Sequence, residues 1–149
     1  MFGSLGHRFA DADWFWERHA NPASGWSRVP TGPLLVYAVY ARNWRLLGWV
    51  LLFVVVNPVL FPRAEPADDE RWITKGVRGE RLWVRGVDAG RANLLTVASA
   101  PAFCAALYAA VRRNSVGTAV LTGLAVALKL AFVNEMAKLY DRERAAESG

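Results

Sequence analysis

Apolar residues gather in two long stretches of the chain, and charged residues gather outside them. The apolar stretches are residues 34–61 and 92–133, whereas nearly all charge lies in residues 1–28, 63–91 and 135–149. In a soluble helical protein, charged residues would recur at every turn of each helix. The observed partition is typical of membrane segments joined by polar loops. It predicts an all-α fold, a polytopic membrane helical bundle of about four hydrophobic helices plus one interfacial amphipathic helix.

The first apolar stretch is interrupted once, by the polar sequence Arg42-Asn43-Trp44-Arg45. At 1.5 Å per residue, residues 33–41 make about 14 Å of helix and residues 45–61 about 25 Å, against a hydrocarbon core of about 30 Å. Three arrangements are therefore open. The stretch forms one long helix, or an interfacial helix followed by a membrane span, or a hairpin with one short leg and one nearly full leg.

The distribution of basic residues favours the hairpin. In a hairpin, Arg42 and Arg45 lie on the same side of the membrane as Arg112 and Arg113, which gives four basic residues there and about thirteen on the other side. A single crossing before Arg63 would place about seven on one side and ten or eleven on the other, which is no bias. We therefore expect the tip of a hairpin at Arg42 to Arg45, and both ends of the chain in the cytoplasm.

The second apolar stretch predicts a transmembrane hairpin. Residues 93–111 carry no charge, Arg112-Arg113-Asn114 makes a tight turn, and residues 115–133 carry only Lys129. Small residues recur at every fourth position in both legs, which would let the two helices approach closely in lipid. The first ridge is Ala98, Ala102, Ala106 and Ala110, and the second is Ala119, Gly123, Ala127 and Ala131.

Two charged residues of this hairpin have different expected roles. Lys129 is a candidate intramembrane charge that faces away from the first leg, and its ammonium is expected to reach the interface along its own stem. Glu135 continues the second ridge, so we expect it near Arg91 as an anchoring pair. The residues that follow, from Asp141, are expected to fray.

Between the two apolar stretches, residues 71–87 predict a helix that lies in the membrane interface. On a helical wheel, tryptophans and valines occupy one side and basic residues the other. The basic side chains are expected to contact anionic lipid headgroups; they are Arg71, Lys75, Arg78, Arg81 and Arg85. Gly76 and Gly79 each weaken the predicted helix by about 1 kcal/mol relative to alanine.

Glu80 interrupts the apolar side of this helix. A carboxyl group there is protonated, paired, or open to a wet cavity, because an unpaired buried charge is costly. We expect a buried salt bridge to Arg18 or Arg28 of the N-terminal segment. The alternatives are a proton-coupling carboxylate and a helix register that differs from the predicted one.

Residues 11–28 interleave three tryptophans with both signs of charge, which suits the headgroup layer. They contain most of a candidate polar cluster, functional or structural, whose members are Glu17, Arg18, His19, Arg28 and, from the later helix, Glu80. His19 could act as a general acid or base with Asp13 or Glu17. A histidine hydrogen-bonded to a neighbouring loop is the simpler interpretation. With His7 as the only other histidine and no cysteine nearby, no metal, haem or other cofactor is predicted.

Four short motifs carry a resemblance to a known family: residues 15–28, Asn57-Pro58, Phe61-Pro62 and residues 79–83. With them the chain resembles a family of small, uncharacterised membrane proteins of haloarchaeal type, a domain of unknown function catalogued as 6653. The resemblance covers most of the chain. It implies an archaeal membrane protein and brings with it no activity, cofactor or catalytic residue.

The composition of the chain limits the partners and the kinds of site that we expect. The net charge of +5 suits anionic headgroups, and no track of basic residues stands apart from the apolar segments, so nucleic-acid binding is not expected. The one cysteine, Cys104, is expected to be a buried small hydrophobe. Residues 1–16 have no continuous apolar core of the kind a cleaved signal needs, so we expect the chain to begin in the cytoplasm.

The sequence therefore predicts a single multi-pass domain of the cell membrane. Its parts are an interfacial segment (1–32), a helical hairpin (33–61), a cytoplasmic amphipathic segment (63–91), a transmembrane hairpin (92–135) and a polar tail (136–149). Phosphate loops, nucleophile elbows and paired-carboxylate motifs are missing, which favours a non-catalytic accessory or structural component over an enzyme. The alternatives are a small oligomeric proton- or ion-coupled transporter and an interfacial lipid-acting enzyme. A second copy or another membrane protein is the expected partner.

Overall fold

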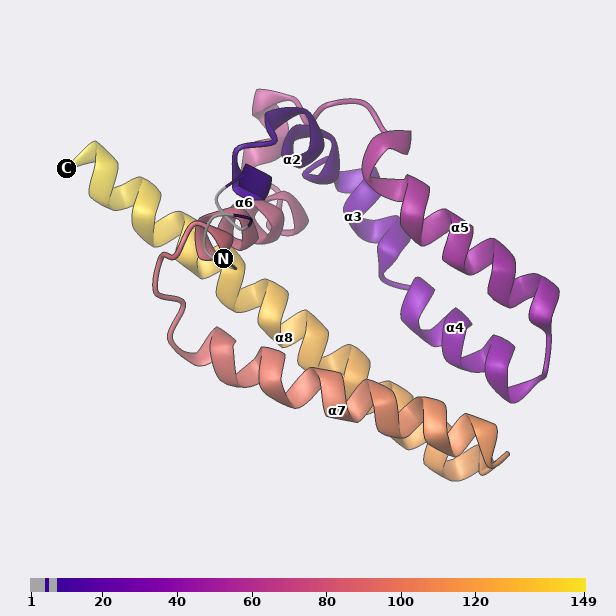
Figure 1. Cartoon of the computed structure of the whole chain (residues 1–149). Helices are drawn as coiled ribbons and strands as arrows, with labels where there is room; N and C mark the ends of the chain where they lie inside the picture. Colours follow the sequence, from indigo (N-terminus) through magenta and orange to yellow (C-terminus); the bar gives the residue numbers. More distant parts are fainter. Residues whose placement is uncertain (1–4, 6–7) are drawn as a thin grey trace.

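The computed structural model describes Leu5 and residues 8–149, and every regular element in this part of the chain is a helix. The all-α prediction is therefore confirmed. Figure 1 shows two long helical hairpins that extend from one cluster of shorter helices. The hairpin helices are α4 (Thr31–Tyr40) with α5 (Trp44–Leu60), and α7 (Arg91–Val111) with α8 (Ser115–Ser148). The cluster, which we call the cap, contains α2 (Asp13–His19), α3 (Pro22–Arg28), the 3-10 helix η1 (Pro66–Glu70), α6 (Trp72–Val84) and the end of α8.

Both hairpins reverse direction through the same turn, an arginine in the left-handed conformation followed by an asparagine. Arg42 has φ 57° and Arg113 has φ 54°. The amide of each following residue, Asn43 or Asn114, donates to a carbonyl five residues back, at 2.9 and 3.0 Å. The asparagine side chain then accepts from the amide three residues ahead, at 3.0 and 2.9 Å, and so caps the next helix. This turn chemistry ends α4 at Tyr40 and excludes one long helix.

The tips of the two hairpins lie at the same end of the molecule, away from the cap (Figure 1). Nη2 of Arg42 donates to the carbonyl of Val111 at 2.6 Å, which joins the first tip to the last turn of α7. Deeper in the protein, Val36 of α4 packs against Ala106 and Ala110 of α7, and all three are fully buried. The tip arginines predicted to share one side of the membrane are therefore at one end of the fold.

Two helices of the described chain, α7 and α8, are long and apolar enough to cross a bilayer by length and composition. Each contains an 18-residue window with a mean hydropathy of 1.8 or 2.0. The hairpin helix α5 is apolar but has 17 residues, and α4 has 10. The predicted bundle of about four membrane helices is thus supported for two of them.

Helix α8 turns a different face to the protein from the one predicted. In α7, Ala102, Ala106 and Ala110 of the expected ridge are buried. In α8, Ala119 and Ala127 are exposed, and a Cβ placed on Gly123 would meet nothing within 4 Å. The reason is that α8 packs against α6 as well as α7, and this second partner fixes its rotation. The buried residues of α8 are Ala125, Phe132, Met136, Ala137 and Leu139.

Contact between α6 and α8 depends on two glycines. A Cβ added to Gly79 would overlap the carbonyl of Met136, and one added to Gly76 would lie 2.5 Å from Cγ1 of Val133. From the sequence, these glycines were expected only to lower the stability of the α6 helix relative to alanine. In the fold they let the two backbones approach closely, which a larger residue would prevent.

The C-terminal residues do not fray as predicted, because α8 continues to Ser148. Lys75 of α6 pairs with Asp141 at 2.9 Å, and Arg144 donates to Glu70 at 2.6 Å. Glu135 also differs from its prediction, since its described partner is Lys138 at 2.8 Å instead of Arg91. Cys104 is exposed on α7, where we expected a buried residue.

Candidate functional site

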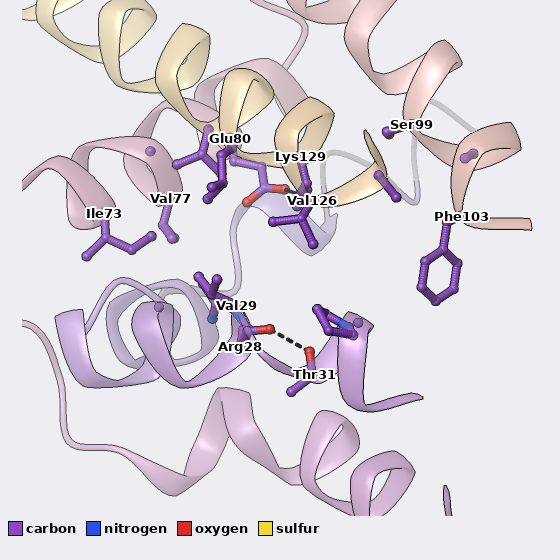
Figure 2. Close-up of a pocket in the computed structure, with 18 of the residues that line it drawn as sticks. Arg28, Val29, Thr31, Ile73, Val77, Glu80, Ser99, Phe103, Val126 and Lys129 are labelled. Atoms are coloured by element: carbon purple, nitrogen blue, oxygen red, sulfur yellow. Dashed lines mark hydrogen bonds and ion pairs between the residues drawn. The ribbon is translucent and has the colours of Figure 1, made fainter. Parts of the chain in front are cut away.

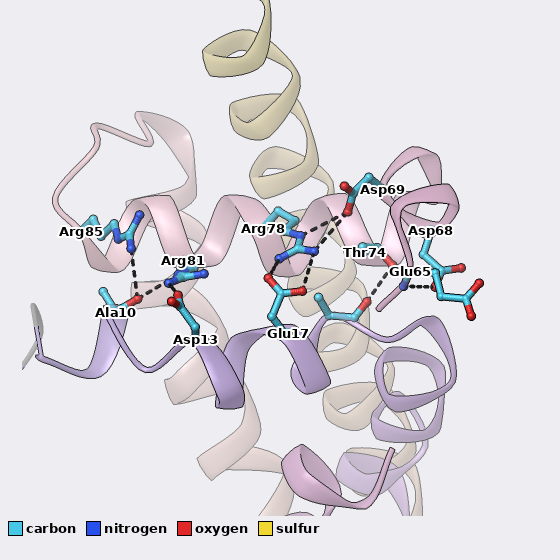
Figure 3. A network of polar contacts seen from close by, with 11 residues as sticks. Ala10, Asp13, Glu17, Glu65, Asp68, Asp69, Thr74, Arg78, Arg81 and Arg85 are labelled. Atoms are coloured by element: carbon cyan, nitrogen blue, oxygen red, sulfur yellow. Dashed lines mark hydrogen bonds and ion pairs between the residues drawn. The ribbon is translucent and has the colours of Figure 1, made fainter. Parts of the chain in front are cut away.

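The basic side of α6 is covered by carboxylates of the cap (Figure 3). Arg78 donates from Nη1 and Nη2 to the two carboxylate oxygens of Glu17 at 2.6 and 3.2 Å, and it also pairs with Asp69 at 3.3 Å. Arg81 pairs with Asp13 and donates to the carbonyl of Ala10 at 2.8 Å. These contacts hold α2 and η1 against α6. The wheel predicted where the basic residues lie, but their nearest partners are side chains of the same chain.

The remaining basic residues of α6 also have protein partners. Arg71 pairs with Asp68 at 3.2 Å, and Arg85 pairs with Asp11 at 3.3 Å. The carboxylate of Asp141 raises the pKa of Lys75. Exposure differs along the row, since the Arg71 side chain is 66% exposed and that of Arg78 only 17%. Contact with lipid headgroups stays a prediction for this row, and Arg71 is the member most free to make it.

The arginines alter the acidity of their partners. The hydrogen bond from Arg78 lowers the pKa of the Glu17 carboxyl, and the hydrogen bond from Arg81 lowers the pKa of Asp13. Both carboxylates are therefore ionised at neutral pH, and each is paired with an arginine of α6. The arrangement in which Asp13 or Glu17 assists His19 is not formed.

Arg18 belongs to a separate contact at the end of α5. Its Nη1 donates to the carbonyl of Phe61 at 3.2 Å, and Nδ2 of Asn21 donates to Pro62 at the same distance. The last carbonyls of a helix lack partners within it, and a nearby cation satisfies them. The expected salt bridge between Arg18 and Glu80 is therefore wrong.

A buried polar chain, missed by the sequence analysis, connects α5 to α3. Asn57 is fully buried; its Oδ1 accepts from Oγ of Ser24 at 2.8 Å and its Nδ2 donates to Oγ of Ser27 at 2.9 Å. Nη1 of Arg28 donates to the same Ser24 hydroxyl at 3.1 Å. The signal was available, since Asn57 is the one amide in an apolar run and therefore requires partners inside the protein.

Arg28 and His19 form the next part of this chain. Nη1 of Arg28 lies 2.7 Å from Nδ1 of His19 and 3.3 Å from the His19 carbonyl. A guanidinium only donates, so Nδ1 accepts and the imidazole is neutral. Burial, and then the charges of Arg28 and Lys129, lower the pKa of His19 to about 3, and burial lowers that of Arg28 to about 10. At neutral pH the pair is a neutral histidine bound to a charged arginine.

Glu80 has a different partner from the one expected. Its Oε1 lies 3.8 Å from Nζ of Lys129, so the predicted salt bridge to Arg28 is wrong. The close contact of α6 with α8 at Gly76 and Gly79 explains this, because it brings Lys129 beside Glu80. The ammonium of Lys129 also lies 4.7 Å from the centre of the Phe132 ring. Lys129 therefore lies beside Glu80 with its side chain 59% exposed, and the expectation that its ammonium reaches the interface stays a prediction.

These groups line a cavity of about 480 Å³ between the cap and the two hairpins. Figure 2 shows Glu80 and Lys129 on one wall and Arg28 with Thr31 on the wall opposite. Four ionisable side chains line it: His19, Arg28, Glu80 and Lys129. Apolar side chains make most of the remaining wall, among them Ile73, Val77, Phe103, Val126, Leu130 and Val133.

Of the predicted polar cluster, the fold brings His19, Arg28 and Glu80 to this cavity and places Glu17 and Arg18 elsewhere. It adds Lys129, which the sequence had assigned a separate role. Within residues 8–149, no three His, Cys, Asp or Glu side chains lie together as a metal site would need. The cavity can pair a charged group with Arg28 or Lys129 and can enclose an apolar group beside it.

Comparison with known proteins gives one match. The sequence matches a family described as "Family of unknown function (DUF6653)" over residues 5–149. No curated protein and no solved structure matches the chain. The description names no source, so the haloarchaeal origin stays a prediction.

Proposed function

Because the chain belongs to the family of unknown function DUF6653, which carries no assigned activity, we propose its function from the geometry. It is a multi-pass membrane protein in which both hairpins enter the bilayer from the cytoplasmic side and the cap remains there. Its role is that of a non-catalytic membrane component. The observation that carries this proposal is the common direction of the two hairpins, whose tips meet at Arg42 and Val111.

Charge supports the orientation. Of the 18 lysine and arginine residues, four belong to the two tips, and the others lie in or near the cap or on α8. Basic residues concentrate on the cytoplasmic side of membrane proteins. The cap is therefore the cytoplasmic part, which puts the C-terminal end of α8 in the cytoplasm.

Exposed apolar surface supports membrane insertion of both hairpins. Trp49 and Val55 of α5 are 70% and 75% exposed, and Leu94, Val97 and Val116 of α7 and α8 are 71–72% exposed. Soluble monomers rarely expose large contiguous apolar patches. Acyl chains, or a second copy of this chain, would cover these residues. With about 26 Å of rise in α5, a locally thinned bilayer or snorkelling of the tip arginines would complete its crossing.

The non-catalytic role is supported by how the polar side chains are used. Asp13, Glu17, Arg18 and Asn57 each contact another helix or the end of one. His19 has its Nδ1 lone pair occupied by Arg28, so that nitrogen is not free to take a proton from a substrate.

Cysteine labelling in intact cells tests the orientation of α7 and α8. In a Cys104→Ala background, Arg112→Cys at the tip should react with a membrane-impermeant maleimide, and Ser148→Cys at the end of α8 should react only after permeabilisation. Both positions are exposed, so the protein itself does not block them. The reverse pattern, or loss of the protein from membranes during a carbonate wash, would refute the proposal.

A second candidate is a small ion-coupled transporter, which the cavity supports. Glu80 and Lys129 are paired only loosely, at 3.8 Å, and both line a space between the hairpins. Such a protein would carry protons or another ion in liposomes, and Glu80→Gln would abolish the flux. Flux that is absent from the wild type would exclude this candidate.

A further inference from the structure

The cavity between the cap and the hairpins contains more positive than negative charge. Of its four ionisable side chains, Arg28 and Lys129 are cations, Glu80 is an anion and His19 is neutral. Its surplus is thus one positive charge. A ligand with a single negative charge would therefore neutralise the cavity.

Arg28 has no carboxylate within 4 Å among the described residues. Its guanidinium contacts neutral groups, namely the ring and carbonyl of His19 and the hydroxyl of Ser24, and all three contact the same nitrogen, Nη1. Nε and Nη2 thus retain donor capacity for a ligand. Glu80 acts on Arg28 only through space, so desolvation remains the larger effect on this half-buried guanidinium, and an anionic ligand would offset its cost.

Lys129 is paired only loosely, and its side chain is 59% exposed, so its ammonium is open to solvent as well as to a ligand. At 3.8 Å from Glu80, its ammonium lies beyond normal hydrogen-bond length, and its other close neighbour is the face of Phe132. An ammonium has three donors. A ligand oxygen could therefore bind Lys129 without displacing Glu80.

The rest of the cavity wall suits a hydrocarbon chain. Phe103, Val126 and Leu130 line it together with alanines and glycines. Towards the hairpin tips the wall reaches Thr122, about 10 Å along α8 from Lys129 at 1.5 Å per residue. The charged groups therefore lie at the cap end of the cavity, and a mostly apolar wall, which includes the hydroxyls of Ser99 and Thr122, extends towards the tips.

We propose that this cavity binds an amphiphile with one anionic headgroup and one hydrocarbon chain, the headgroup between Arg28 and Lys129 and the chain along α7 and α8. Its volume of about 480 Å³ lies within the range of about 300–1,000 Å³ for small-molecule sites. The direction of the ligand, with its charge at the cytoplasmic boundary, rests on the proposed membrane orientation. Fatty acids and alkyl phosphates share the required chemistry.

Native mass spectrometry of the full chain in a nonionic detergent tests the proposal. The probes are dodecanoate and dodecyl phosphate, and the comparison compounds are dodecanol, dodecyltrimethylammonium and inorganic phosphate. The account predicts that at least one of the two anionic probes binds at one per chain, and that each comparison compound binds at least tenfold more weakly. Equal binding of dodecanol or the cation would overturn the role of charge. Equal binding of inorganic phosphate would overturn the role of the chain.

Two matched lysine variants locate the site. Lys129→Met should weaken binding about tenfold, the effect of losing one charge-assisted contact. The two side chains are similarly exposed, at 59% and 65%, so Lys138→Met should leave binding unchanged because Lys138 pairs with Glu135 outside the cavity. Equal effects of the two variants would overturn the assignment.

Two further variants keep the test valid if Lys129→Met unfolds. Lys129→Arg retains the charge and should bind within a few-fold of the wild type. Glu80→Gln removes the competing anion and should tighten binding, and weaker binding by a folded Glu80→Gln protein would contradict the geometry. Failure of these binding tests leaves the labelling result untouched, so the two proposals are judged separately.

Discussion

Nη2 of Arg42 lies 2.6 Å from the carbonyl oxygen of Val111, and this hydrogen bond ties the tip of the first hairpin to the end of α7. The two residues are 69 positions apart in the sequence. Both hairpins therefore point away from the cap with their tips in contact. The equivalent arginine of the second turn, Arg113, has no such side-chain bond among those described.

Glycine substitutions in the two turns should separate backbone strain from this hydrogen bond. Arg113→Gly should stabilise the protein by about 0.5–1 kcal/mol, because glycine adopts a left-handed conformation without steric cost. Arg42→Gly gains the same relief but loses the bond to Val111, so its gain should be smaller or reversed. Thermal unfolding in detergent measures both. Equal stabilisation by the two variants would show that the bond contributes nothing.

Replacing Gly79 of α6 and Gly123 of α8 with alanine should change stability in opposite directions, because Gly79 is closely packed and Gly123 is open. Gly79→Ala should destabilise the fold by about 3 kcal/mol or more, since its Cβ overlaps the carbonyl of Met136 and the backbones have to move apart. Gly123→Ala lies in open space within a helix and should stabilise by up to about 1 kcal/mol. Denaturant titration of the purified protein reports both values. A neutral Gly79→Ala would argue against the close packing of α6 on α8.

Loss of the Glu17 charge should destabilise the cap. Glu17→Gln leaves Arg78, whose side chain is 17% exposed, with one carboxylate fewer, and should cost about 1–3 kcal/mol. Glu135→Gln should cost under about 0.5 kcal/mol and serves as the control, because its partner Lys138 is 65% exposed and keeps its contact with water. Because the pKa of Glu17 is lowered in the folded state, its stabilisation is present above pH 4.5 and is lost as the pH falls below that value. Denaturant unfolding at pH 7 compares the two variants.

His19 should make stability depend on pH over a definite window. Its pKa is 6.5 when unfolded and about 3 when folded, so between these values the unfolded chain binds more protons. The free energy of unfolding contributed by this group is therefore full above pH 6.5. It falls by about 1.4 kcal/mol for each pH unit as the pH drops from 6.5 towards 3.

His19→Asn is the variant that tests this dependence, because an asparagine Oδ1 can replace Nδ1 as the acceptor for Arg28. The variant should remain folded and show a shallower fall in stability between pH 6.5 and 4.5. Unfolding curves at half-unit steps of pH measure the slope. An unchanged slope in the variant would mean that His19 titrates normally in the folded protein.

Features that depend on neighbouring residues, such as turns and the two sides of an amphipathic helix, were well predicted from the sequence. The polar breaks at Arg42-Asn43 and Arg113-Asn114 end one helix and cap the next, and both functions depend on the turn itself. The apolar side of α6 and its basic side were also predicted, since a helical wheel needs only spacing. The break at Arg42-Asn43 alone left three arrangements open, and it was the distribution of basic residues along the whole chain that favoured the hairpin.

Partners across the fold were not predictable in the same way. A wheel shows that Arg78 and Arg81 share a side, but it does not show that α2 lies against them. Glu80 was paired with the wrong cation because its partner depends on where α8 crosses α6. The predicted rotation of α8 was wrong for the same reason, because α8 packs against α6 as well as α7.

The crossing of α5 is the central claim, because this apolar helix has 17 residues and is shorter than α7 and α8, which are long enough to cross a bilayer. Labelling of Arg45→Cys and Arg63→Cys, at opposite ends of α5 in a Cys104→Ala background, measures it most directly. We expect an impermeant maleimide to label Arg45→Cys in intact cells and Arg63→Cys only after permeabilisation. Labelling of both cysteines from the same side would contradict the account.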